Sequence, residues 1–106
     1  MTIDILGTKY SITQSNETDD PCLKNCDGYC DHTVKKIVID TFHKEPMSVE
    51  NLDEYTKKIT RHELVHAFLF ESGLGGESWA NNEELVDWVA FQFPKMLEAM
   101  KNANAL

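Results

Sequence analysis

The apolar residues of this chain change their spacing near Asp40. Before that point most of them are β-branched or aromatic and tend to alternate with polar residues, as in half-buried strands. After it they recur at the spacing of amphipathic helices. Separate strand and helix patterns are typical of α+β folds. We therefore expect a small N-terminal antiparallel β-sheet of about three strands, followed by a long helix and a second helix.

The first part of the chain should contain short strands. Two of them are expected to form a hairpin that turns at Gly7 and Thr8, with apolar residues at Ile3, Ile5, Tyr10 and Ile12. A further strand is expected at residues 37–39. Residues 15–32 are rich in Asn, Asp, Gly and Cys without a sustained period, which predicts a long loop.

The long helix is expected to begin after Ser48, which is a suitable N-cap, and to end at Gly73. Its apolar residues recur at helical spacing and are Leu52, Tyr55, Ile59, Leu69 and Phe70. A Gly-rich connection follows.

The second helix should begin after Asn81 or Asn82, and its apolar arc includes Leu85, Val86, Val89 and Phe93. Pro94 should end or kink it, because a proline inside a helix lacks the N–H donor. A short final helix would then run from Pro94 to about Met100. Two aromatic residues outside the arc suggest a second packing surface, in a monomer or a weak homodimer: Trp88 and Phe91.

Length and charge exclude several classes of protein. With 106 residues the chain suits one domain, so we expect a single domain over residues 1–106. A net charge of −8 argues against binding to nucleic acids or anionic membranes. The chain shows no membrane span and no secretory leader, and its odd count of three cysteines disfavours a secreted disulfide scaffold. We expect a cytoplasmic protein.

Residues 62–66 read His-Glu-Leu-Val-His, an H-E-x-x-H motif inside the expected long helix. Positions i and i+4 share a helix face, so His62 and His66 can bind one Zn²⁺. Glu63 lies about 100° round the helix, where it can hold a metal-bound water and accept its proton. The alternative is a pair of structural core histidines. Both imidazoles fall in the apolar arc, however, where they need polar partners that a metal would supply.

Catalytic zinc generally has three protein ligands, so a third must be found. The metzincin pattern fails, because Leu69 and Ser72 occupy the positions of its Gly and its third His. Glu71 lies on the same helix as the histidines and cannot fold back to them. Glu77 falls in the Gly-rich connection and is poorly fixed.

The remaining candidates are Glu83 and Glu84, at the start of the second helix. On a helical wheel Glu83 lies at the edge of the buried arc, whereas Glu84 points away from it. We therefore prefer Glu83 as the third ligand and leave Glu84 as the alternative. Asp87 lies on the same side as Glu83 and is expected to accept the N–H of a ligand imidazole, that of His62.

The motifs at residues 62–67 and 83–90 resemble those of gluzincins, the zinc metallopeptidases with H-E-x-x-H on one helix and a glutamate ligand on the next. The second motif is similar to the E-x-x-A-D and E-x-x-x-D signatures of that clan, with Val86 where alanine is common. The chain looks most like the minimal gluzincins, including ImmA/IrrE-type and phage- or prophage-encoded metallopeptidases. In those families the glutamate is the ligand and the aspartate orients a histidine.

The resemblance implies a minimal zincin-like fold and zinc-dependent hydrolysis of a peptide or protein, with Glu63 activating the water. An edge strand of the sheet could hold an extended peptide. Larger gluzincins add a Tyr, His or Arg that stabilises the oxyanion, and no residue here matches that position by motif. Tyr29, His32 and His43 are candidates by their chemistry alone, and the alternative for each is an ordinary loop residue. The alternative is a catalytically weak or inactive zinc-containing protein-binding module of phage or prophage origin.

The cysteines Cys22, Cys26 and Cys30 repeat at a spacing of four, with His32 close behind. A structural Cys₃His zinc site is conceivable. The usual C-x₂-C spacing is absent, however, and an Asp-Gly pair between the cysteines favours a turn. Free thiols are the preferred interpretation.

Overall fold

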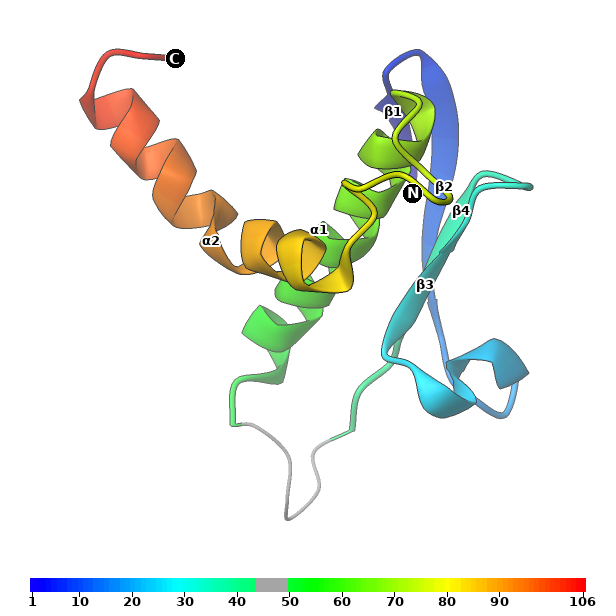
Figure 1. Cartoon of the computed structure of the whole chain (residues 1–106). Helices are drawn as coiled ribbons and strands as arrows, with labels where there is room; N and C mark the ends of the chain where they lie inside the picture. Colours follow the sequence, from blue (N-terminus) through cyan, green and yellow to red (C-terminus); the bar gives the residue numbers. More distant parts are fainter. Residues whose placement is uncertain (44–49) are drawn as a thin grey trace.

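The computed structural model describes residues 1–43 and 50–106, and it confirms the α+β class. In chain order the elements are strands β1 (Thr2–Ile5) and β2 (Thr8–Ser15), the short 3₁₀ helix η1 (Pro21–Asn25), strands β3 (Gly28–Asp31) and β4 (Lys36–Asp40), and helices α1 (Leu52–Glu71) and α2 (Glu83–Asn102). The strands form one sheet, α1 packs against it, and α2 packs on α1 (Figure 1).

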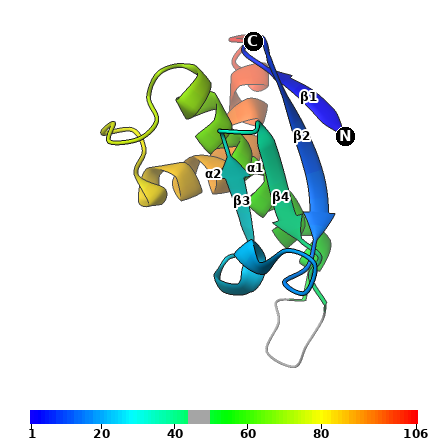
Figure 2. The ribbon, with the colours of Figure 1, turned by 90° about the vertical axis from the view of Figure 1, so that its right-hand side faces the viewer.

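The sheet has four strands in the order β1-β2-β4-β3, side by side in Figure 2. β1–β2 and β3–β4 are antiparallel, but β2 and β4 are parallel. The prediction of about three strands is roughly consistent with this sheet, but the prediction that the sheet is antiparallel is wrong for the β2–β4 pair. The additional strand, β3, lies within the segment expected to be a loop. It forms a hairpin with β4, and β4 lies between β3 and β2 and runs parallel to β2.

The hairpin between β1 and β2 turns at Leu6 and Gly7, one residue earlier than expected. These residues have φ angles of 50° and 92°. Two-residue hairpin turns of the mirror-image type need positive φ at both central positions, which glycine adopts freely and leucine does not. The Asp4 carboxylate stabilises the turn by accepting the Gly7 N–H at 3.1 Å.

The core lies between the sheet and α1. Its buried residues come from three of the strands and from α1, and they are Ile5, Tyr10, Ile37, Ile39, Ile59 and Ala67. β4 is an inner strand, so the side chains of Ile37 and Ile39 point into this core while that of Val38 points to the opposite face. This packing fixes which face of α1 is turned toward the sheet.

Helix α1 is capped at both ends by residues that the sequence supplies locally. The Asn51 side chain accepts the N–H of Glu54 at 3.1 Å, and the predicted cap, Ser48, lies outside the described residues. Gly73 has a φ of 86°, and Leu74 donates its N–H to the Leu69 carbonyl at 2.7 Å. This is the glycine-dependent helix stop expected at Gly73.

Helix α2 begins after Asn82, whose side chain accepts the Leu85 N–H at 3.1 Å. It continues through Pro94 to Asn102, so the separate short helix expected from Pro94 is wrong, although α2 changes direction along its length (Figure 1). Its buried residues are Val86 and Ala90. The large apolar residues that are exposed include Leu85, Trp88, Phe91 and Phe93. Neither α1 nor α2 has an apolar stretch that could cross a lipid bilayer.

A side chain from α1 compensates for the proline in α2. Pro94 has no N–H to donate to the carbonyl of Ala90, four residues earlier. Arg61 donates its Nε–H to that carbonyl oxygen at 2.6 Å. The bond joins the two helices at their crossing, and it allows α2 to remain helical through the proline.

We expect Arg61→Met to lower the free energy of unfolding by about 1–3 kcal/mol, because the Ala90 carbonyl loses its donor while the apolar part of the side chain is kept. In a Pro94→Ala background the new backbone N–H can serve Ala90, so the same change should cost less. Denaturant unfolding of the four proteins measures both effects. An equal cost in the two backgrounds would contradict this account.

The end of α1 is tied to the sheet through Glu71. Its carboxylate accepts hydrogen bonds from Thr8 Oγ1 at 2.9 Å and from the Tyr10 hydroxyl at 2.6 Å, and it pairs with Lys35 Nζ at 2.8 Å. The hydrogen bond from Lys35, and to a smaller extent the one from Tyr10, lowers the pKa of Glu71 to about 2. Because Glu71 is committed here, it has no role at the histidines.

We expect a Glu71→Gln variant to be less stable than the wild type at neutral pH, with a difference that disappears in acid. The pKa of Glu71 is lowered on folding from about 4.5 to about 2, so its stabilisation is complete above pH 4.5 and is lost as the pH falls toward 2. Thermal unfolding of both proteins between pH 7 and pH 2 tests this. The exposed Glu77 provides a matched Glu→Gln control. A difference that does not change with pH would refute the role of the carboxylate charge.

Candidate metal centre

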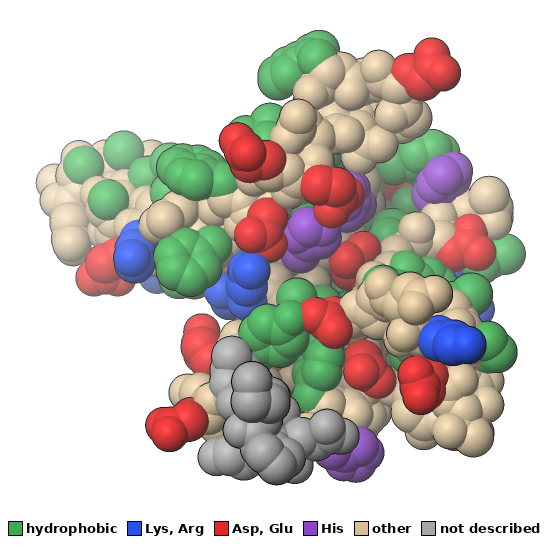
Figure 3. Space-filling view, turned by 60° about the horizontal axis from the view of Figure 1, so that its bottom comes forward, with side chains coloured by type: hydrophobic (Ala, Val, Ile, Leu, Met, Phe, Trp, Pro, Cys, Tyr) green, Lys and Arg blue, Asp and Glu red, His purple; other side chains and the backbone are tan. Residues whose placement is uncertain are grey.

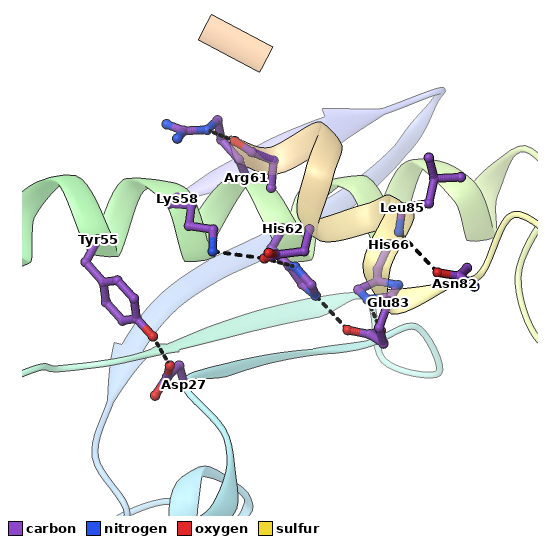
Figure 4. A network of polar contacts seen from close by, with 11 residues as sticks. Asp27, Tyr55, Lys58, Arg61, His62, His66, Asn82, Glu83 and Leu85 are labelled. Atoms are coloured by element: carbon purple, nitrogen blue, oxygen red, sulfur yellow. Dashed lines mark hydrogen bonds and ion pairs between the residues drawn. The ribbon is translucent and has the colours of Figure 1, made fainter. Parts of the chain in front are cut away.

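His62, His66 and Glu83 meet where the start of α2 approaches α1 (Figure 4). Glu83 Oε2 lies 3.0 Å from His62 Nε2, and Glu83 Oε1 lies 2.7 Å from His66 Nε2. One carboxylate thus contacts both imidazoles. The potential ligand atoms of the three residues all lie within 4.8 Å of one another.

Local features of both helices position these three side chains. His62 and His66 are one turn apart on α1, and their side chains are 14% and 19% exposed. Glu83 is the first residue of α2, directly after the Asn82 cap, and its side chain is 73% exposed. Glu84 is exposed and does not join the ligand group. Of the two glutamates considered from the sequence, the structure brings Glu83 to the histidines.

The donor set fits a metal ion. Two imidazole nitrogens and one carboxylate oxygen form a ligand set that catalytic zinc sites use, with a fourth position left for water or substrate. Tetrahedral ligands at about 2.1 Å from one ion are about 3.4 Å apart. The observed N–O separations of 3.0 and 2.7 Å are close to that value.

Asp87 lies behind His62, one helical turn after Glu83. Its Oδ1 is 3.4 Å from His62 Nδ1 and 3.0 Å from Lys58 Nζ. Lys58, and to a smaller extent His62, lower the pKa of Asp87 and so favour its ionised form. A carboxylate at Nδ1 orients the ring and leaves Nε2 directed toward Glu83. This is the place that the helical wheel predicted for Asp87.

Glu63 is buried next to the two histidines, with 7% of its surface exposed. It occupies the same face of α1 as Ile59 and Ala67, the two helical residues of the core. Burial raises the pKa of Glu63 to about 7; the negative charge of Glu83 adds to this rise and His62 opposes it. A carboxyl group with a pKa near neutrality can both accept and release a proton at physiological pH.

The suggested oxyanion residues do not join this group. The Tyr29 hydroxyl donates a hydrogen bond to Asp20, and Tyr29 lines a hollow together with Val38, on the face of the sheet that points away from the core. His32 stacks on Phe70 with ring centroids 3.9 Å apart. His43 is exposed and is not among the potential ligands.

The three cysteines have free thiols. Cys22 and Cys26 are exposed, and Cys30 packs against the core from β3. Burial raises the pKa of Cys30 to about 11, which keeps its thiol protonated at neutral pH. Within residues 1–43 and 50–106, the cysteines and His32 do not form a metal-ligand group.

For two residues near the centre, no role at the site was predicted from the sequence. Lys58 lies one turn before His62 and pairs with Asp87. Tyr55 lies one turn before Lys58, and its hydroxyl donates to Asp27, just ahead of β3 (Figure 4). The spacing of three and four residues along α1 could have identified them, because it places Tyr55, Lys58 and His62 on one face of the helix.

Comparisons with known proteins add no relative. A scan of protein-family models, a search of curated proteins and a search of solved structures each found no match to this chain.

Proposed function

We propose that this protein is a zinc-dependent metallo-endopeptidase of the gluzincin type. One observation carries the proposal: the donor atoms of His62, His66 and Glu83 converge within 4.8 Å, next to the buried Glu63 carboxyl. Two histidines with a glutamate form a known ligand set for catalytic zinc. The resemblance of both helix motifs to those of gluzincins agrees with this choice of metal.

The residues around the centre have separate roles in this proposal. His62, His66 and Glu83 hold the zinc ion, and Asp87 orients His62. Bound zinc supplies Lewis-acid chemistry, which polarises a peptide carbonyl and makes water more acidic. A carboxylate oxygen of Glu63 accepts the proton of the attacking water, and the same carboxyl group then donates a proton to the leaving amine.

Strand β3 offers a site for an extended peptide. It is an edge strand of the sheet, it packs against α1, and it runs beside the histidines in Figure 4. The backbone groups on its outer edge are available to pair with another chain. A peptide added there would extend the sheet at β3.

The second candidate function is a zinc-containing protein-binding module with little or no turnover. It is favoured by the positions of Tyr29 and His32, which have partners elsewhere and supply no oxyanion donor to the centre. In either function we place the protein in the cytoplasm, because its three free thiols are compatible with a reducing compartment.

Metal content and hydrolysis, measured on the same sample, test the proposal. The protein is purified without chelators or nickel resin, zinc is quantified by elemental analysis, and an unbiased peptide library is analysed by mass spectrometry after incubation. We expect one zinc per chain and cleaved peptides. Zinc without cleavage would support the binding module, and an absence of bound metal would overturn both candidates.

A further inference from the structure

A groove lies near the candidate metal centre, between the first half of α1 and the middle of α2. It has a volume of about 410 Å³ and mainly apolar walls, to which Tyr55, Phe91 and Pro94 contribute. The groove is open at the surface, and Figure 1 shows the two helices diverging from their crossing. Its size suits one or two residues of a peptide.

The groove concentrates positive charge in an acidic protein. Three of the ten basic residues line it, in a chain with a net charge of −8: Lys58, Arg61 and Lys95. Glu54 is the one carboxylate among the described lining residues. Figure 3 shows basic side chains next to apolar ones on the face that also exposes histidines.

The basic groups are held in place but retain donors for a ligand. Arg61 uses Nε for the Ala90 carbonyl, so its two terminal nitrogens remain. The Lys95 ammonium lies over the Phe91 ring, 5.5 Å from its centroid, at the surface. Lys58 pairs with Asp87 through one of three donor hydrogens. An anion in the groove can therefore meet groups from both helices.

The groove is linked to the metal centre through the contacts of Lys58, which lines it. Lys58 Nζ is 3.0 Å from Asp87, and Asp87 is 3.4 Å from His62. An extended chain advances by about 3.3 Å per residue. A peptide whose bond lies at the histidines would therefore present a neighbouring residue to the groove.

We propose that this groove binds a carboxylate of the peptide substrate, close to the bond held at the metal centre. The inference rests on the proposed peptidase function for the identity of its ligand. The aliphatic part of the ligand packs on Tyr55, Phe91 and Pro94 while its carboxylate pairs with Arg61 and Lys95. An acidic side chain and the C-terminus of a peptide both offer this chemistry.

Matched peptides distinguish these two sources of the carboxylate. The probes are fluorescein-labelled alanine hexapeptides with one Glu, Gln or Lys and an amidated C-terminus, together with the Gln peptide as a free acid. Binding to zinc-loaded Glu63→Gln protein is followed by fluorescence anisotropy, and cleavage by the wild type is measured in parallel. We expect the Glu peptide or the free acid to bind at least about threefold more tightly than the amidated Gln peptide. This difference in affinity should become smaller at high salt.

Two charge-reversal variants on α2 test whether the preference for a carboxylate arises in the groove. Lys95→Glu changes the groove, whereas Lys101→Glu makes the same change in the last turn of the helix. We expect Lys95→Glu to abolish the preference for the carboxylate and Lys101→Glu to leave it unchanged. Equal effects of the two variants, or no preference in either measurement, would overturn the assignment.

The two measurements separate this proposal from the proposed function. Cleavage without any preference for a carboxylate would retain the peptidase and reject the groove. Carboxylate-dependent binding that Lys95→Glu abolishes, without cleavage by the wild type, would retain the groove and reject the peptidase.

Discussion

Exchange of Glu63 for Gln is expected to lower the rate of peptide hydrolysis by about 10²- to 10⁴-fold while zinc remains bound. The amide has nearly the shape of the carboxylate but cannot accept the proton of the attacking water. The ligand atoms of His62, His66 and Glu83 are unchanged by the substitution. The loss should therefore appear in kcat rather than in metal content.

Stability provides the control for the Glu63→Gln variant. Burial raises the pKa of Glu63 on folding from 4.5 to about 7, so ionisation of this group destabilises the zinc-free fold as the pH rises through that range. The neutral amide does not ionise. The zinc-free variant should accordingly be at least as stable as the zinc-free wild type at pH 8. A variant that binds zinc and keeps full activity would exclude Glu63 as the base.

Glu83→Gln should reduce zinc affinity by more than about 100-fold, whereas Glu84→Gln should leave it unchanged. The carboxylate of Glu83 contacts both imidazoles, and that of Glu84 is exposed outside the ligand group. Both residues lie in the first turn of α2, so both substitutions remove the same favourable interaction with the helix dipole. The difference between the variants reports the ligand role alone.

Competition with a chromophoric zinc chelator measures the affinities of these two variants and the wild type. Thermal unfolding without zinc serves as the control, and the two variants should agree in it. If both variants lost the same zinc affinity, Glu83 would not be the third ligand. The acidic first turn of α2 would then act only through its charge.

Much of the candidate site could be predicted because its information is local. The i, i+4 spacing places His62 and His66 on one face of any helix, whatever the helix packs against. The same rule relates Glu83 to Asp87. The helix caps at Asn82 and Gly73 could also be predicted, because they depend on backbone hydrogen bonds to residues only a few positions away.

The sheet was harder to predict because strand pairing is not local. β3 contains Gly28 and Cys30, which give a weak strand pattern, and it is stabilised by β4 and α1. The parallel pair β2–β4 depends on a crossing connection through η1 and β3 that no periodicity reveals. Similarly, Leu85 and Phe93 are exposed because α1 covers a different part of the α2 surface, and this packing is also not local.

The sequence by itself determined the α+β order, the two helices and the candidate ligands on each, since helix periodicity and capping act over a few residues. Only the tertiary structure decided how those ligands meet. The crossing of α1 and α2, held in part by Arg61 and the Ala90 carbonyl that Pro94 leaves free, brings Glu83 to the histidines. The packing of α1 on the sheet buries Glu63 and raises its pKa. Both effects depend on contacts between residues far apart in the chain.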